Sequence, residues 1–172
     1  MSVHIGEPAP NFKAQAVNAD GEFVDLNLEN YRGKWTVLFF YPLDFTFVCP
    51  TEIRGFNEKY AEFIELNAEV IGASTDSLYS HLAWMNDGLG KVQFPLIADF
   101  TKELAQKYDV LVPSEGFALR GTFIIDPEGI VRSAVINDAP VGRSVDETLR
   151  TLQALQTGKN TPCGWQPGEE TL

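Results

Sequence analysis

The run Trp35-Thr36-Val37-Leu38-Phe39-Phe40-Tyr41, followed directly by Pro42, decides the fold class of this chain. Its aromatic and β-branched residues are apolar at successive positions, which is typical of a central strand buried on both faces. Pro42 ends the strand because proline has no N–H to donate to a neighbouring strand. From Pro50 onward, apolar side chains recur every three or four residues, which predicts an amphipathic helix to about Leu66.

Strands and helices alternate along the rest of the chain. The turn residues Asp20-Gly21 predict an N-terminal hairpin made of strands 12–17 and 22–26. Further strands are expected at 69–74, 94–98, 122–125 and 130–136, and the last two are joined by the tight turn 126–129. Further helices are expected at about 77–86, 101–108 and 145–156. This order predicts an α/β sandwich, in which a central mixed sheet is flanked by helices.

Polar residues mark the beginnings of the three later helices. Asp76 or Ser77 can cap the first of them, and Thr101 can cap the second. Ser144 and Glu147 form a capping box, in which a hydroxyl and an acid three residues later open the last helix.

The length of 172 residues predicts one domain with a short appendage. Beyond Gly158 the apolar periodicity is lost, and Pro162 and Pro167 interrupt the chain. We therefore predict one domain over residues 1–158 and an irregular C-terminal arm over 159–172, which contains Cys163.

The charge and hydropathy patterns exclude several classes of partner. The chain has 13 Lys and Arg against 24 Asp and Glu, so its net charge of −11 would repel nucleic acids and anionic membranes. No run approaches the roughly 18 apolar residues of a membrane span. Residues 1–8 have neither a basic nor an apolar leader, and the expected location is the cytoplasm.

Two cysteines, Cys49 and Cys163, are too few and too far apart for a disulfide scaffold. Together with His4 and His81 they would reach the four ligands of a zinc site, but no ligand spacing supports one, and we expect no metal. Lone cysteines in a cytoplasmic protein are most often inert core residues. The surroundings of each cysteine therefore decide between an inert and a reactive thiol.

Cys49 lies where the buried strand has ended and the helix begins, with Pro50 suited to the first helical turn. The free N–H groups and the positive dipole end of that helix favour an anion such as a thiolate. Thiolate formation alone adds little rate, because nucleophilicity falls as the thiol becomes more acidic. A fast thiol enzyme also needs groups that stabilise charge on the leaving oxygen, and the Thr46 hydroxyl and an arginine from elsewhere in the chain could supply them.

Five motifs, in order along nearly the whole chain, resemble those of the typical two-cysteine peroxiredoxins, the subgroup similar to alkyl hydroperoxide reductase C. They are Gly6-Glu7-Pro8-Ala9-Pro10-Asn11-Phe12; Tyr41-Pro42 with Phe45-Thr46-Phe47-Val48-Cys49-Pro50-Thr51-Glu52; Arg120-Gly121-Thr122-Phe123-Ile124-Ile125-Asp126; Val141-Gly142-Arg143-Ser144-Val145-Asp146-Glu147; and Thr161-Pro162-Cys163-Gly164-Trp165. The resemblance implies a thioredoxin-like fold, which agrees with the predicted sandwich.

The resemblance implies a thiol peroxidase in which Cys49 attacks the O–O bond of a hydroperoxide and becomes a sulfenic acid. Thr46 would hold the peroxide and Arg120 would stabilise the thiolate and the developing charge. Pro42, together with Pro50, would shield the pocket.

Two further residues that match the family would position Arg120, and a third would complete the catalytic cycle. Glu52 and Arg143 match the residues that orient the active-site arginine in the family. Cys163 matches the resolving cysteine, which condenses with the sulfenic acid of a partner subunit to form an intersubunit disulfide.

The resemblance also implies the partners. The substrate would be hydrogen peroxide or an organic hydroperoxide, and a thioredoxin or a flavoprotein disulfide reductase would return the dithiol. No metal or organic cofactor is implied. The chain would form a homodimer through its sheet edge, and five dimers would form a decamer with the loop near Leu78 and Tyr79 at the second interface.

Two other functions remain open on the sequence. A holdase chaperone could use the same oligomeric scaffold. A disulfide oxidoreductase acting on proteins is disfavoured, because Thr46 replaces the first cysteine of the usual C-x-x-C motif.

Overall fold

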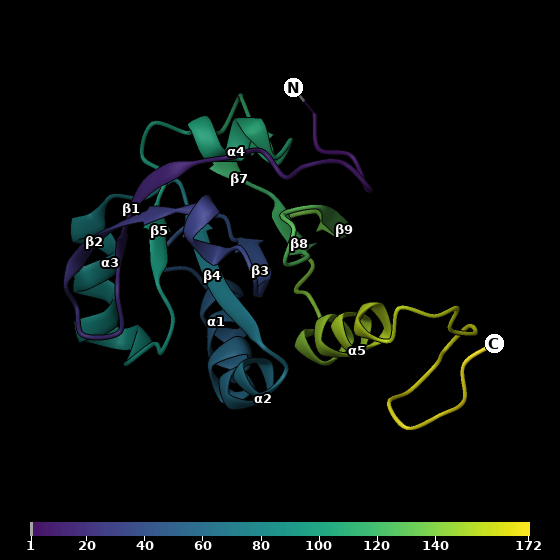
Figure 1. The fold of residues 1–172 in the computed structure, drawn as a ribbon. Helices are drawn as coiled ribbons and strands as arrows, with labels where there is room; N and C mark the ends of the chain where they lie inside the picture. Colours follow the sequence, from purple (N-terminus) through teal and green to yellow (C-terminus); the bar gives the residue numbers. More distant parts are fainter. Residues whose placement is uncertain (1) are drawn as a thin grey trace.

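The computed structural model describes residues 2–172, and a seven-stranded sheet lies at its centre (Figure 1). Its strands, in spatial order, are β2 (Phe23–Asn27), β1 (Lys13–Val17), β5 (Leu96–Ala98), β4 (Ala68–Ser74), β3 (Trp35–Phe40), β8 (Arg120–Ile125) and β9 (Val131–Asn137). The strands β3, β4 and β5 are parallel, whereas β1 with β2 and β8 with β9 form antiparallel pairs. The predicted mixed sheet and N-terminal hairpin are confirmed.

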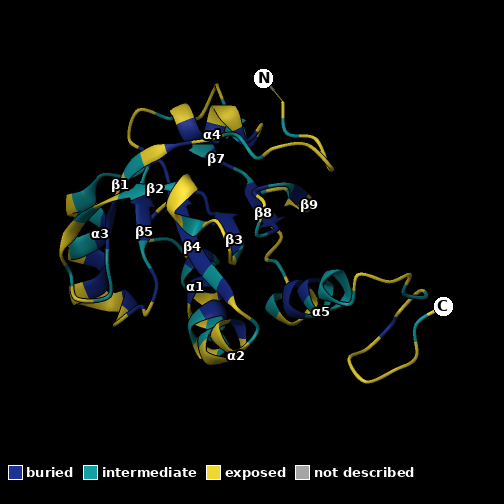
Figure 2. Ribbon diagram, in the orientation of Figure 1, coloured by how far each residue is buried: buried dark blue, intermediate teal, exposed yellow. Residues whose placement is uncertain are grey.

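Helices cover both faces of the sheet. They are η1 (Leu28–Tyr31), α1 (Cys49–Glu58), α2 (Tyr60–Glu65), α3 (Leu78–Trp84), η2 (Met85–Leu89), α4 (Glu103–Lys107) and α5 (Val145–Gln156). Side chains of α1, α2, α3 and α5 pack against one face, and those of α4 and η1 pack against the other. Figure 2 shows the resulting buried layer in dark blue along the central strands. The sandwich predicted from the sequence is confirmed.

The strand β3 is buried on both faces, as its composition predicts. Phe39 stacks on Phe56 of α1, with ring centroids 4.3 Å apart. Phe40 points to the opposite face and packs against Phe123 and Tyr108. Because β3 is anchored on both faces, its carboxyl end is a rigid platform for the loop that leads into α1.

The single helix predicted over 50–66 is wrong in one respect, because the structure divides it at Lys59 into α1 and α2. Lys59 has φ −95° and ψ 2°, outside helical geometry. The apolar face nevertheless continues across the break, with the rings of Phe56 and Phe63 5.9 Å apart. Because the break spans one residue and the buried face continues, the spacing of the apolar residues is nearly unchanged. The apolar pattern of the sequence therefore could not reveal the break.

The prediction that Thr101 caps a helix is also wrong, because α4 begins only at Glu103. The cap comes from Asp99, whose carboxylate accepts the backbone N–H groups of Leu104 at 2.9 Å and of Ala105 at 2.7 Å. The caps by Ser77 and Ser144 are confirmed. Two short strands, β6 (Leu111–Val112) and β7 (Phe117–Ala118), form a separate pair that is too short for a periodic signal.

The segment 159–172 has no helix or strand, and it turns away from α5 as an irregular arm (Figure 1). Trp165 is the buried side chain of this arm, with 4% of its surface exposed. Arg150 of α5 donates a hydrogen bond to the Trp165 carbonyl at 2.8 Å, which ties the arm to the helix. Among residues 2–172, no helix combines the length and the apolar character needed to span a membrane.

Candidate active site

Cys49 is the first residue of α1, and its side chain is completely buried. The eight residues 41–48 connect it to the end of β3, and Pro50 occupies the first helical turn. The Thr51 hydroxyl donates to the Val48 carbonyl at 2.6 Å and closes this turn. The thiol therefore lies at a helix N-terminus beyond the carboxyl end of a central strand, the edge at which open α/β sheets bind ligands.

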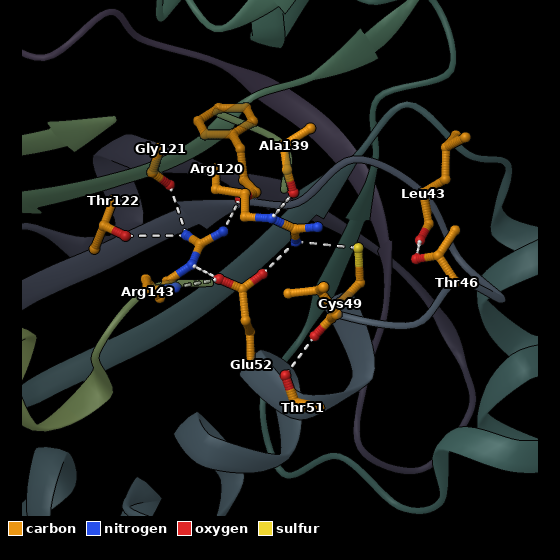
Figure 3. A network of polar contacts seen from close by, with 12 residues as sticks. Leu43, Thr46, Cys49, Thr51, Glu52, Arg120, Gly121, Thr122, Ala139 and Arg143 are labelled. Carbon is orange, nitrogen blue, oxygen red and sulfur yellow. Dashed lines mark hydrogen bonds and ion pairs between the residues drawn. The ribbon is translucent and has the colours of Figure 1, made fainter. Parts of the chain in front are cut away.

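Arg120 places a positive charge beside the sulfur. It begins β8, which runs antiparallel to β3, so the start of β8 lies next to the end of β3. Arg120 Nη1 is 3.3 Å from Cys49 Sγ, and Nε donates to the Ala139 carbonyl at 2.7 Å (Figure 3). A hydrogen bond from a guanidinium to a sulfur atom is stronger when the sulfur is ionised.

Glu52 bridges the two arginines of the site. It follows Cys49 by three residues on α1, so both side chains lie on the same side of the helix. One carboxylate oxygen is 2.5 Å from Arg120 Nη1, and the other is 2.6 Å from Arg143 Nε. The three side chains are almost fully buried, and together they leave one net positive charge next to the Cys49 sulfur. A thiolate at Cys49 would balance that charge.

Arg143 ties the site to the sheet. Its Nη1 donates to the Gly121 carbonyl and to the Thr122 hydroxyl, both at 2.9 Å, and Nη2 donates to the Phe40 carbonyl. Burial lowers the pKa of Arg143 from its usual value, although the Glu52 carboxylate acts in the opposite direction. Arg143 therefore fixes Glu52 against both β3 and β8.

Thr46 and Pro42 lie in the loop between β3 and α1. Pro42 is buried two residues beyond the end of β3, and Thr46 is half-buried. The Thr46 hydroxyl is 2.8 Å from the Leu43 carbonyl, which can only accept, so the hydroxyl is the donor. The donor role toward a bound oxygen that the sequence predicts for Thr46 is therefore not what the structure shows, because its proton is already engaged and only its Oγ1 lone pairs are available to a ligand.

The second cysteine lies away from this site. Cys163 is exposed in the C-terminal arm beyond α5, Cys49 is buried, and both are free thiols. Figure 1 shows α1 and the arm in well-separated parts of the fold. Of the predicted site residues, the structure brings together Cys49, Glu52, Arg120 and Arg143, whereas it does not bring Cys163 to Cys49 within the chain.

A second polar cluster, which was not predicted from the sequence, includes Asp44 of the loop between β3 and α1. Asp44 accepts from the Tyr41 hydroxyl at 2.8 Å and lies 2.7 Å from His81 Nδ1. Burial would lower the pKa of His81, but its hydrogen bond and ion pair with Asp44 raise it above the usual value. The sequence does contain one indication of this cluster, because Asp44 lies between Pro42 and Thr46, two residues of the predicted site.

The same cluster is the one group among residues 2–172 with three potential metal ligands close together, Asp44, Asp76 and His81. Their ligand atoms lie within 4.8 Å of one another. Each side chain already has protein hydrogen-bond partners: Tyr41 for Asp44, Ser74 for Asp76 and the Ile97 carbonyl for His81. The donor set is thus satisfied as a hydrogen-bonded network.

A buried thiol at a helix N-terminus, with a guanidinium beside it on a thioredoxin-like sheet, defines a thiol-dependent redox enzyme. The AhpC/TSA family matches residues 5–134, most of the chain. The chain belongs to this family, the peroxiredoxins, and is a thiol peroxidase.

Close relatives agree with this assignment. Peroxiredoxin-2 of Bos taurus is 53% identical over 98% of this chain and 89% of its own length. A protein described as a putative peroxiredoxin in the rubredoxin operon of Clostridium pasteurianum is 53% identical over 98% of both chains. The structure of reduced 2-Cys peroxiredoxin from Plasmodium vivax is 40% identical, covers 98% of this chain and 92% of its own, and superposes with a TM-score of 0.95.

Proposed function

We propose that this chain reduces hydrogen peroxide and organic hydroperoxides to water or alcohol, with Cys49 as the peroxidatic and Cys163 as the resolving cysteine. The single observation that carries the proposal is the 3.3 Å contact between Arg120 Nη1 and the Cys49 sulfur. It supports a thiolate with a fixed positive charge beside it, at a sulfur that is buried in this structure.

In the first step, the Cys49 thiolate attacks the terminal oxygen of the hydroperoxide. The S–O bond forms as the O–O bond breaks, the sulfur is oxidised to sulfenic acid, and the leaving alkoxide or hydroxide takes up a proton. Arg120 Nη2 has no acceptor among residues 2–172 and remains available to the leaving oxygen. Thr46 Oγ1 accepts a hydrogen bond from the O–H group of the bound hydroperoxide and so orients it.

In the second step, the Cys163 thiol attacks the Cys49 sulfenic acid and releases water, forming a disulfide. The two cysteines are apart within one chain and Cys163 is exposed, which supports resolution by the arm of a partner subunit. A thioredoxin or a flavoprotein disulfide reductase then supplies two electrons and two protons to restore both thiols.

Two exposed surfaces support a homodimer and a larger ring. The strand β9 is at the edge of the sheet, and Val135 and Ile136 on it are 52% and 45% exposed. Unpaired apolar edges favour pairing with another strand. Tyr79 is 75% exposed at the start of α3, where the second interface of a pentamer of dimers is expected.

A non-reducing gel tests the cysteine assignments. Reduced protein receives one equivalent of hydrogen peroxide, next to the Cys49→Ser and Cys163→Ser variants. A covalent dimer is expected in the wild type and in neither variant. Peroxide consumption without a dimer would contradict the role of Cys163, and no consumption at all would contradict the role of Cys49.

The holdase function stays a prediction. Apolar side chains of the site loop are accessible, since Phe47 is 95% and Phe45 is 58% exposed. Suppression of client aggregation that persists in the Cys49→Ser variant would support it, because holding a client needs no thiol chemistry.

A further inference from the structure

One peptide unit connects Thr46 to the loop that follows β4. The carbonyl oxygen of Leu43 accepts a hydrogen bond from the Thr46 hydroxyl at 2.8 Å. The N–H of Asp44, on the other end of the same peptide bond, donates to Asp76 Oδ2 at 2.9 Å. Because a peptide unit is planar, the direction of its N–H fixes the direction of its carbonyl.

Asp76 is itself held in place. The Ser74 hydroxyl, at the end of β4, donates to the same Asp76 oxygen at 2.5 Å. The strands β4 and β3 are parallel, with Ala73 opposite Phe40, so the loops after both strands share one edge of the sheet. Asp76 therefore links the loop that carries Thr46 to the end of the rigid strand β4.

The side chain of Asp44 fixes the same peptide unit from another direction. Its carboxylate lies 2.8 Å from the Tyr41 hydroxyl and 2.7 Å from His81 Nδ1. The other nitrogen of His81 donates to the Ile97 carbonyl of β5 at 2.9 Å. Both the N–H and the side chain of Asp44 are therefore attached to central strands or to elements packed on them.

We propose that Asp76 is a positioning residue for the peroxide step: through the Leu43–Asp44 peptide unit it directs the Thr46 hydroxyl and so aims the Oγ1 lone pairs at the substrate. Asp76 forms no hydrogen bond with Cys49 or Arg120, so its effect on the substrate passes through Thr46. The inference rests on the proposed role of Thr46 in holding the hydroperoxide.

The test separates substrate positioning from damage to the thiol. The rate constant for sulfenic acid formation is measured by stopped-flow fluorescence with hydrogen peroxide, and the rate of Cys49 alkylation is measured with iodoacetamide, which does not need Thr46. Both are measured in the Cys163→Ser background, where Cys49 is the only thiol. In Asp76→Ala we expect peroxide oxidation to slow by about tenfold, as for a modest misplacement of a catalytic group, with alkylation unchanged.

A double-mutant cycle tests whether the effect passes through Thr46. Thr46→Val alone should slow peroxide oxidation by roughly 100-fold, the scale of losing one transition-state hydrogen bond. Adding Asp76→Ala to Thr46→Val should then cause no further loss, because the hydroxyl that Asp76 directs is gone. Independent, multiplicative effects would overturn the inference.

Asp126→Ala is the matched control. Its carboxylate also holds a loop after a strand, since it accepts from the N–H groups of Glu128 and Ile130, but at the end of β8 away from Arg120. This variant should leave the ratio of the two rates unchanged. If Asp76→Ala does not fold, Asp76→Asn is measured in the same way, with a smaller loss of roughly threefold because a neutral oxygen is the weaker acceptor.

Each remaining outcome decides one of the two claims. An unchanged peroxide rate in Asp76→Ala, or an equal fall in both rates, would overturn the positioning role of Asp76. An unchanged peroxide rate in Thr46→Val would instead overturn the role of Thr46 in the proposed function.

Discussion

At the scale of single residues, the site is a chain of buried charges that ends at a thiol. Arg143 holds Glu52, Glu52 holds Arg120, and Arg120 Nη1 reaches the Cys49 sulfur at 3.3 Å. Each link is buried, so none is weakened by competition with water. Removing one member leaves its partners charged and unpaired, which is far more costly than losing an exposed ion pair.

Glu52→Gln should therefore destabilise the protein, because it removes the charge that Arg120 and Arg143 share. We expect the free energy of unfolding to fall by about 3 to 5 kcal/mol, the cost of breaking a buried ion pair. Urea denaturation measures this loss. The control is Glu147→Gln, which removes the exposed partner of Arg150 and should cost at most about 1 kcal/mol. Equal losses in the two variants would contradict the account.

At the scale of elements, α3 and the loop after β3 are joined by one ion pair. His81 Nε2 donates to a carbonyl, and Nδ1 faces a carboxylate, so both ring nitrogens face acceptors when Asp44 is ionised. This arrangement favours the imidazolium, in agreement with a pKa of His81 raised by Asp44 against the effect of burial. The neighbouring Tyr41 stays protonated, because burial and Asp44 raise its pKa well above the usual value.

The contribution of His81 to stability should depend on pH. The pKa of His81 is higher in the folded protein than in the unfolded chain, so the protonated imidazole stabilises the fold. This contribution is fully present when the pH is below the unfolded pKa of about 6.5, and it is lost as the pH rises through the folded pKa. The difference in unfolding free energy between wild type and His81→Asn should be larger at pH 6 than at pH 9. Asp76, the other acid that faces His81, is common to both proteins. A difference that stays constant or grows with pH would contradict the ion pair between His81 and Asp44.

At the scale of the whole molecule, the sheet gathers residues that are distant in the sequence. Cys49 and Arg120 are 71 positions apart, and Glu52 and Arg143 are 91 apart. The start of β8 lies beside the end of β3, which places the arginine of one strand over the helix that follows the other. The exposed arm and the unpaired β9 edge lie outside this centre, where a second copy of the chain can reach them.

The sandwich fold and the side chains that form the site could be predicted from the sequence. A strand buried on both faces and a cysteine at the start of a helix each leave a recognisable pattern of residues. The carbonyls of Ala139 and Gly121, which hold the two arginines, leave no such pattern, since any residue offers a backbone carbonyl. The donor direction of Thr46 and its link to Asp76 also depend on a loop conformation that no periodicity encodes.

Cys49, which lies beside Arg120, is expected to react directly with a hydroperoxide. The measurement that tests it most directly is the mass of reduced Cys163→Ser protein after one equivalent of hydrogen peroxide in the presence of dimedone, which traps sulfenic acid. We expect one adduct, located at Cys49, that forms much more slowly in Arg120→Lys, because lysine lacks the planar fork of donors. An unmodified Cys49, or an adduct that forms equally fast without the guanidinium, would contradict it.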